Sequence, residues 1–115
     1  MKKTFLLLVF TLLLHTGFSK KVKFAVDMTG QTISAFGMHV SGDFQEAAGY
    51  PLNWESNSTP LTQEGTTDIY SIVVDIPAFN KYEYKFVNGD QFYDAEFVPE
   101  ESRVGYNFND IRFIF

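Results

Sequence analysis

The sequence contains no cysteine and only two histidines, His15 and His39. Without thiols, the chain cannot form disulfides, zinc–thiolate sites, a cysteine nucleophile or a cysteine-linked lipid anchor. Two histidines so far apart in the sequence also provide no histidine cluster for a metal. With 115 residues the chain has room for one domain at most, and apolar burial has to stabilise it.

Basic residues are also scarce, because nine Lys and Arg stand against 14 Asp and Glu, for a net charge of −5. An acidic surface argues against nucleic acids and anionic membranes as partners. Acidic residues gather late in the chain, at Asp90, Asp94, Glu96, Glu100 and Glu101. They lack the D-x-[DN]-x-[DN]-G pattern of a calcium loop, so we favour a solvated acidic rim over a metal site.

Long hydrophobic runs are confined to the N-terminus. Lys2 and Lys3 precede the apolar run Phe5–Leu14, and the segment Thr16–Ser19 that follows contains the small residues Gly17 and Ser19. This order is typical of a secretory signal peptide, and the run is too short for a bilayer that needs roughly 20 helical residues. We therefore predict a signal peptide at residues 1–19, with cleavage near Ser19–Lys20, and an exported domain, periplasmic or secreted, at residues 20–115.

Aromatic residues are plentiful, with 13 Phe, six Tyr and one Trp in the whole chain. Each buried aromatic side chain removes on the order of 150–250 Å² from water. Since small exported domains often depend on disulfides, this content provides the alternative source of stability.

Beyond the predicted signal peptide, no stretch has a period of 3.6 residues, whereas several alternate with a period of two. Strands are expected at Val22–Met28, Met38–Phe44, Asp68–Ile76, Tyr82–Val87 and Asp110–Phe115, with a short edge strand at Pro60–Thr62. In the second strand His39 and Ser41 should face outward, and in the last Ile111, Phe113 and Phe115 inward with Arg112 outward. The fold class predicted is all-β, an antiparallel immunoglobulin-like β-sandwich of about seven strands.

The most regular stretch is Tyr82–Phe92, which is predicted to form a hairpin. Tyr82, Tyr84 and Phe86 share one face, and Lys85 lies on the other. Asn88-Gly89-Asp90 provides a turn, and Phe92 and Tyr93 should begin the return arm with one side chain inward and one outward.

Six segments of the chain resemble, in order, the starch- and glycogen-binding modules of carbohydrate-binding module families 20 and 48. They read VKFAVDM, GMHVSGDF, TPLT, DIYSIVVDIP, YEYKFVNGDQF and NDIRFIF. The resemblance implies an immunoglobulin-like sandwich that binds α-glucan or a related polysaccharide without catalysis. It implies sugar contacts by Lys85, by Phe92 as an aromatic platform and by Asn109. Ala47 stands where the family's first tryptophan is usual, and the single Trp54 comes later.

Trp54 lies in a polar loop, where an indole suits the flat face of a pyranose or folds back as a lid on the core. Lys85 is equally compatible with a solvated strand lysine, and Asn109 with a turn residue. The alternative function is a protein–protein or scaffolding module on the same sandwich, with exposed edge strands available for strand addition.

Catalysis is not expected. His39 and Ser41 share a strand face, but this spacing alone does not make a base and a nucleophile. A domain filled by its own core also leaves little room for the cleft of a glycoside hydrolase. The sequence therefore predicts a binding protein without a cofactor, rather than an enzyme.

Overall fold

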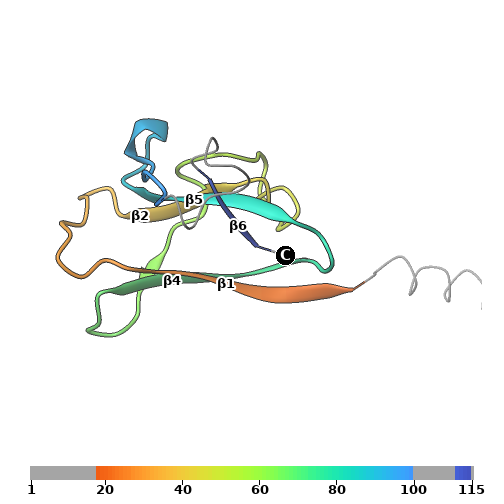
Figure 1. The fold of residues 1–115 in the computed structure, drawn as a ribbon, viewed down its shortest axis with the longest axis horizontal. Coiled ribbons are helices and arrows are strands. Elements are labelled where there is room, and N and C mark those ends of the chain that lie inside the picture. Colours follow the sequence, from red (N-terminus) through yellow and green to blue (C-terminus); the bar gives the residue numbers. More distant parts are fainter. Residues whose placement is uncertain (1–17, 100–110, 115) are drawn as a thin grey trace, which may run out of the picture.

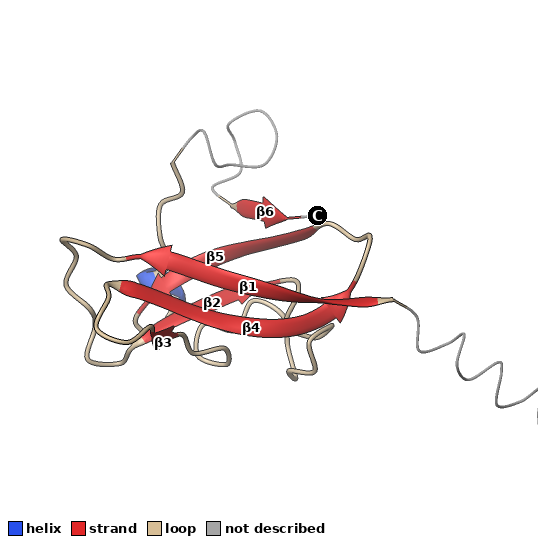
Figure 2. Cartoon of the chain, turned by 90° about the horizontal axis from the view of Figure 1, so that it is seen from below, coloured by secondary structure: helices blue, strands red, loops and turns tan. Residues whose placement is uncertain are grey.

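The computed structural model of the chain describes residues 18–99 and 111–114. In this part of the chain there are six strands and one short 3₁₀ helix: β1 Ser19–Asp27, β2 Met38–Gly42, β3 Thr62–Gln63, β4 Ile69–Pro77, β5 Tyr82–Asn88, η1 Phe92–Asp94 and β6 Arg112–Ile114. The strands form two antiparallel three-stranded sheets, in the orders β1-β4-β3 and β2-β5-β6. The sheets stack face to face (Figures 1 and 2). The all-β prediction is confirmed, with six strands instead of about seven.

The core lies between the two sheets and is built from the faces that alternation predicted. Phe24 of β1, Val74 and Ile76 of β4, and Tyr82 and Phe86 of β5 are all buried there. β1 and β4 pair over nine residues, with Val22 opposite Val74, so inward side chains of both strands stay in register. Aromatic rings fill much of the space, as in the tilted pair of Phe24 and Phe44 with centroids 4.5 Å apart.

The prediction that the second strand exposes its other face is wrong. His39 and Ser41 are buried, and β2 is buried along its whole length. The loop between β2 and β3 folds back on the side of this sheet that faces away from β1 and β4 (Figure 1). The loop brings buried Gln45 and Thr59 to the carbonyl of Val40. The polar groups of this second face are thus satisfied under the loop rather than by water.

The predicted hairpin is correct for β5 and its turn but wrong for the return arm. Phe92 opens the helix η1 instead of a strand, and the segment after the turn forms only an isolated bridge with β5, between Ala95 and Val87. Asp94 explains the change, because its carboxylate accepts the backbone N–H of Gln91 at 3.1 Å and its own N–H donates to the Gln91 carbonyl at 2.9 Å. These bonds close a compact turn. Gly89 makes room for it, since its φ is +133° and a Cβ there would collide with the Asp94 carboxylate.

The orientation predicted for the last strand is reversed. Arg112 and Ile114 pair with Tyr84 and Tyr82, whose side chains face the core, so they share that face. Phe113 is instead 39% exposed. Ile111 is partly buried, and Phe115 lies outside the described residues.

Of the predicted signal peptide, only Phe18 and Ser19 fall within the described residues. Ser19 is the first residue of β1 and pairs with Pro77 of β4. In the described part of the chain, no helix has the length and hydrophobicity needed to cross a membrane.

Candidate functional site

Two aromatic residues predicted for the site, Trp54 and Phe92, lie in the same hollow although they are far apart in the sequence. The hollow has a volume of about 270 Å³ and is lined by Trp54, Glu55, Ser56, Asn57, Asp90, Gln91 and Phe92. Its two walls are the β2–β3 loop and the turn that leads into η1. Both lie on the outer side of the β2-β5-β6 sheet (Figure 1). The site is thus built by two connections on one sheet face.

The rings of the hollow are accessible. Trp54 is 42% exposed and Phe92 is 81% exposed. Tyr93, the neighbour of Phe92, is 72% exposed and packs edge-on against it, with centroids 5.4 Å apart. The expectation that one of this pair points inward was wrong, because helical backbone does not alternate as a strand does. Phe92 is thus the more exposed of the two rings that line the hollow.

Trp54 has an unusual backbone conformation, with a φ of +58°. Non-glycine residues adopt positive φ at a cost, and persist there only when their surroundings hold them. Hydrogen bonds at Trp54 and at the next residue hold this backbone conformation. The N–H of Trp54 donates to the carbonyl of Gly42 at 3.0 Å, which ties the loop to the end of β2. The next residue, Glu55, is bound at both its N–H and its carbonyl by the side chain of Gln45.

Gln45 is the residue that sequence reasoning missed. We expected it only to begin a polar loop, but its side chain is completely buried. Its Oε1 accepts from the N–H of Glu55 at 2.9 Å, and its Nε2 donates to the Glu55 carbonyl at 2.8 Å and to Thr59 Oγ1 at 2.9 Å. The two hydrogen bonds to Glu55 resemble those that one strand residue makes with its partner in a β-sheet. One side chain therefore fixes the segment that begins the hollow's wall.

The polar residues of the hollow were also missed, although the sequence carried a signal for them. Each of the two aromatic residues has an acid and an amide beside it: Glu55 and Asn57 follow Trp54, while Asp90 and Gln91 precede Phe92. Aromatic rings beside a few polar groups are typical of ligand-binding sites. Gln91 Nε2 donates to the Asp90 carboxylate at 3.3 Å, so these two side chains lie together at the rim.

The other predicted site residues are placed differently. Lys85 is half-buried on β5, opposite Ser41 of β2, and is not among the residues that line the hollow. Asn109 lies outside the described residues, so its predicted role is untested. Ala47 is exposed in the β2–β3 loop. Within residues 18–99 and 111–114, no group of three or more His, Asp or Glu side chains is arranged to hold a metal ion.

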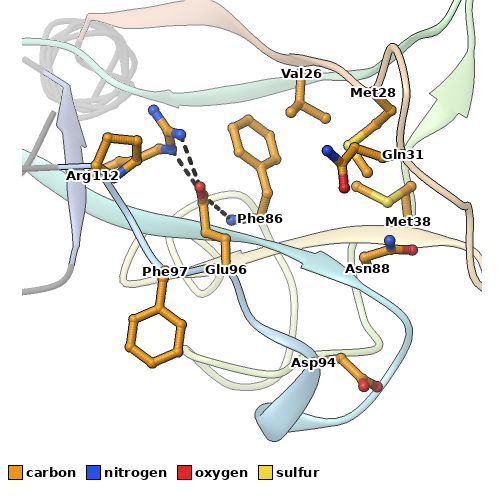
Figure 3. Close-up of a pocket in the computed structure, with 11 residues that line it drawn as sticks. Val26, Met28, Gln31, Met38, Phe86, Asn88, Asp94, Glu96, Phe97 and Arg112 are labelled. Carbon is orange, nitrogen blue, oxygen red and sulfur yellow. Dashed lines mark hydrogen bonds and ion pairs between the residues drawn. The ribbon is translucent and has the colours of Figure 1, made fainter.

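A second cavity of about 350 Å³ lies between the sheets (Figure 3). Its apolar wall includes Val26, Met28, Met38 and Phe86. At its edge Arg112 grips the Glu96 carboxylate with two hydrogen bonds of 2.8 Å, and Glu96 also accepts the N–H of Phe86. These hydrogen bonds raise the pKa of Arg112 further above its ordinary value.

Two further polar side chains of this second cavity, those of Asn88 and Asp94, are also engaged. The Asn88 side chain accepts from the N–H of Ser34 and donates to the carbonyl of Thr32, both at 2.8 Å. Asp94 is held by the η1 turn. Because the side chains of Arg112, Glu96, Asn88 and Asp94 already bind the protein itself, we regard this cavity as part of the packing between the sheets and the hollow as the candidate site.

Comparison with known proteins provides no further guide, because no family model, curated protein or solved structure matches this chain. The site therefore has to be interpreted from its own geometry.

Proposed function

We propose that this protein binds glycans without catalysis, and that the Trp54–Phe92 hollow is the binding site. The observation that carries the proposal is that two exposed rings from separate connections line one hollow whose other residues are polar. Pyranose rings have apolar faces and hydroxyl-bearing edges. A site that offers rings beside amides and carboxylates complements both parts.

The size of the hollow favours weak binding to a small part of a longer chain. About 270 Å³ is just below the range of roughly 300–1,000 Å³ typical of small-molecule pockets. A few stacked rings and hydrogen bonds have to offset the ordering of both partners, so we expect a Kd on the order of 10 μM to 1 mM. Polysaccharides with many equivalent units suit such a site.

The ligand class proposed is α-glucan, as in starch and glycogen, or a related polysaccharide. The support is the resemblance of the six sequence segments to starch-binding modules, which would also make the sandwich immunoglobulin-like. In that arrangement Trp54 and Phe92 stack on the sugar, while Lys85 and Asn109 orient it. The protein would act outside the cytoplasm after removal of residues 1–19.

The alternative is a protein-binding or scaffolding module that uses an exposed strand edge. β1 is the edge of its sheet over nine residues. Two exposed lysines, Lys21 and Lys23, lie on this strand and form ion pairs with Asp75 and Glu64. Charged side chains of this kind protect edges from pairing, so this feature gives the strand-addition alternative less support than the hollow gives to glycan binding.

Affinity electrophoresis through amylopectin tests the proposal. Trp54→Ala and Phe92→Ala should each lose retardation without a loss of thermal stability, since both rings are exposed. Lys85→Ala should also weaken retardation, because the Lys85 amine is proposed to orient the sugar. Phe79→Ala is the matched control, because Phe79 is 89% exposed but lies in the β4–β5 turn. Equal retardation of the wild type and all of these variants would remove the hollow from consideration.

Titration with maltoheptaose gives a second readout, since the chain has one tryptophan. A saturable change in Trp54 emission supports the proposal. An unchanged emission in a folded protein, together with no retardation, favours the protein-binding alternative.

A further inference from the structure

The charge of the hollow goes beyond what the resemblance implies. Glu55 and Asp90 line the hollow, one from each wall, so each wall carries an acidic residue. Among the described residues that line the hollow, none is basic. A cationic group of a ligand is therefore favoured in the hollow over an anionic one.

The same hollow also offers two aromatic faces. A cationic ammonium group is attracted to the face of a tryptophan or phenylalanine ring by the ring's quadrupole, and tryptophan is the best such acceptor. Rings and carboxylates that converge on one small space are the combination by which proteins recognise ammonium ligands. A neutral sugar would use only the rings and the hydrogen bonds of this site.

We propose that the Trp54–Phe92 hollow prefers glycans with free amino groups, such as polymers of glucosamine, over neutral and acidic glycans. This inference rests on the proposed function, since it names the ligand class of the same site. The pyranose would stack on Trp54 or Phe92 and place its ammonium group toward Glu55 and Asp90. Uronic acids and sulfated sugars would be repelled by the same carboxylates.

The test is a calorimetric titration of the full domain with two matched probes, the hexasaccharide of glucosamine and the hexasaccharide of N-acetylglucosamine. They share a backbone, but only the first carries free amines. We expect the glucosamine probe to bind about tenfold more tightly at low salt, equivalent to about 1.4 kcal/mol. Because the carboxylates are exposed, this preference should shrink toward unity as added salt screens the charges.

Variants locate the effect. Asp90→Asn and Glu55→Gln should each reduce the preference severalfold, because each lowers the affinity for the glucosamine probe more than the affinity for the N-acetylated probe. Asp75→Asn is the control. It also removes one negative charge, but Asp75 lies on β4 in the other sheet, paired with Lys21 at 3.2 Å. It should leave the preference intact.

The outcomes separate this inference from the proposed function. Equal affinity for the two probes, with Trp54→Ala abolishing both, overturns the amino-sugar preference and leaves glycan binding in place. A preference that falls as much in Asp75→Asn as in Asp90→Asn also overturns it, because the overall charge would then be the cause. No binding of either probe or of maltoheptaose overturns both proposals.

Discussion

Replacement of Gln45 by alanine tests how the candidate site is held together. The Gln45 side chain is fully buried and binds both the N–H and the carbonyl of Glu55, at 2.9 and 2.8 Å. Alanine leaves these two groups without their protein partner, and a stranded buried group costs about 1–3 kcal/mol. Water can reach part of the half-buried Glu55, which places each loss near the lower end. Together with the cavity left behind, we expect a loss of about 2–4 kcal/mol.

That loss is large for a small domain, whose total stability is about 5–15 kcal/mol. At about 4–8 °C per kcal/mol for this size, the midpoint of thermal unfolding should fall by at least about 8 °C. The effect on tryptophan emission is as informative as the loss of thermal stability. Since Gln45 holds the residue after Trp54, the tryptophan emission of the folded variant should shift as the loop loosens and the indole becomes more solvated.

The assay is thermal and urea unfolding, with tryptophan emission recorded on the folded protein. Gln63→Ala is the matched control, because Gln63 is exposed and its Nε2 binds only the carbonyl of Thr67, at 2.7 Å. It should change stability by about 0.5 kcal/mol or less. If Gln45→Ala is as stable as Gln63→Ala, or if its emission matches the wild type, Gln45 does not position the loop and the reasoning is refuted.

Three further perturbations test the frame around the site. Gly42→Ala should destabilise by about 3 kcal/mol in urea unfolding, because a Cβ there would collide with the β5 backbone. Arg112→Lys should cost about 1 kcal/mol, since lysine cannot grip the Glu96 carboxylate at two points. The hydrogen bond from Lys23 lowers the pKa of Glu64. The stability that this pair adds, measured against Lys23→Gln, should be complete above about pH 4.3 and vanish as the pH falls through the folded-state pKa.

Each of these has its own control. Gly30 has open space around it, so Gly30→Ala should lose only about 1 kcal/mol, from its φ of +78°. Equal losses at the two glycines would contradict the close approach of β2 and β5. Unchanged stability of Arg112→Lys would mean that the ion pair between Arg112 and Glu96 does not contribute to the stability of the fold. A difference between wild type and Lys23→Gln that persists in acid would exclude Glu64 as its source.

The strand faces that pack between the sheets were predictable from the sequence, because alternation is a local property. Phe24, Val74 and Phe86 lie where their strands' period of two places them. The errors occur where contacts between segments far apart in the sequence determine which face of a strand is buried. Alternation predicted that the His39 side chain faces outward. It is instead buried, and its Nδ1 donates to the Gly89 carbonyl at 2.6 Å. No local pattern shows that a loop will return over that face.

The candidate site was predictable in its rings but not in its assembly. Trp54 and Phe92 stood out as exposed aromatics in polar surroundings, and they do line one hollow. The sequence could not show that they would be neighbours, because that depends on the loop fixed by Gln45 and on the turn closed by Asp94. Both the loop and the turn are held by hydrogen bonds between a side chain and backbone groups. Such hydrogen bonds leave no periodic pattern in the sequence.

The anchoring of the β2–β3 loop has a consequence for engineering. Binding loops are commonly treated as exchangeable parts on a passive scaffold, but here Gln45 and Thr59 belong to the interior of the molecule as well as to the loop. Grafting a foreign loop would remove these buried side chains and their hydrogen bonds, so new specificities should be sought by randomising only residues 54–57. Insertions are better directed to the turn at Gly65, where open space surrounds the chain.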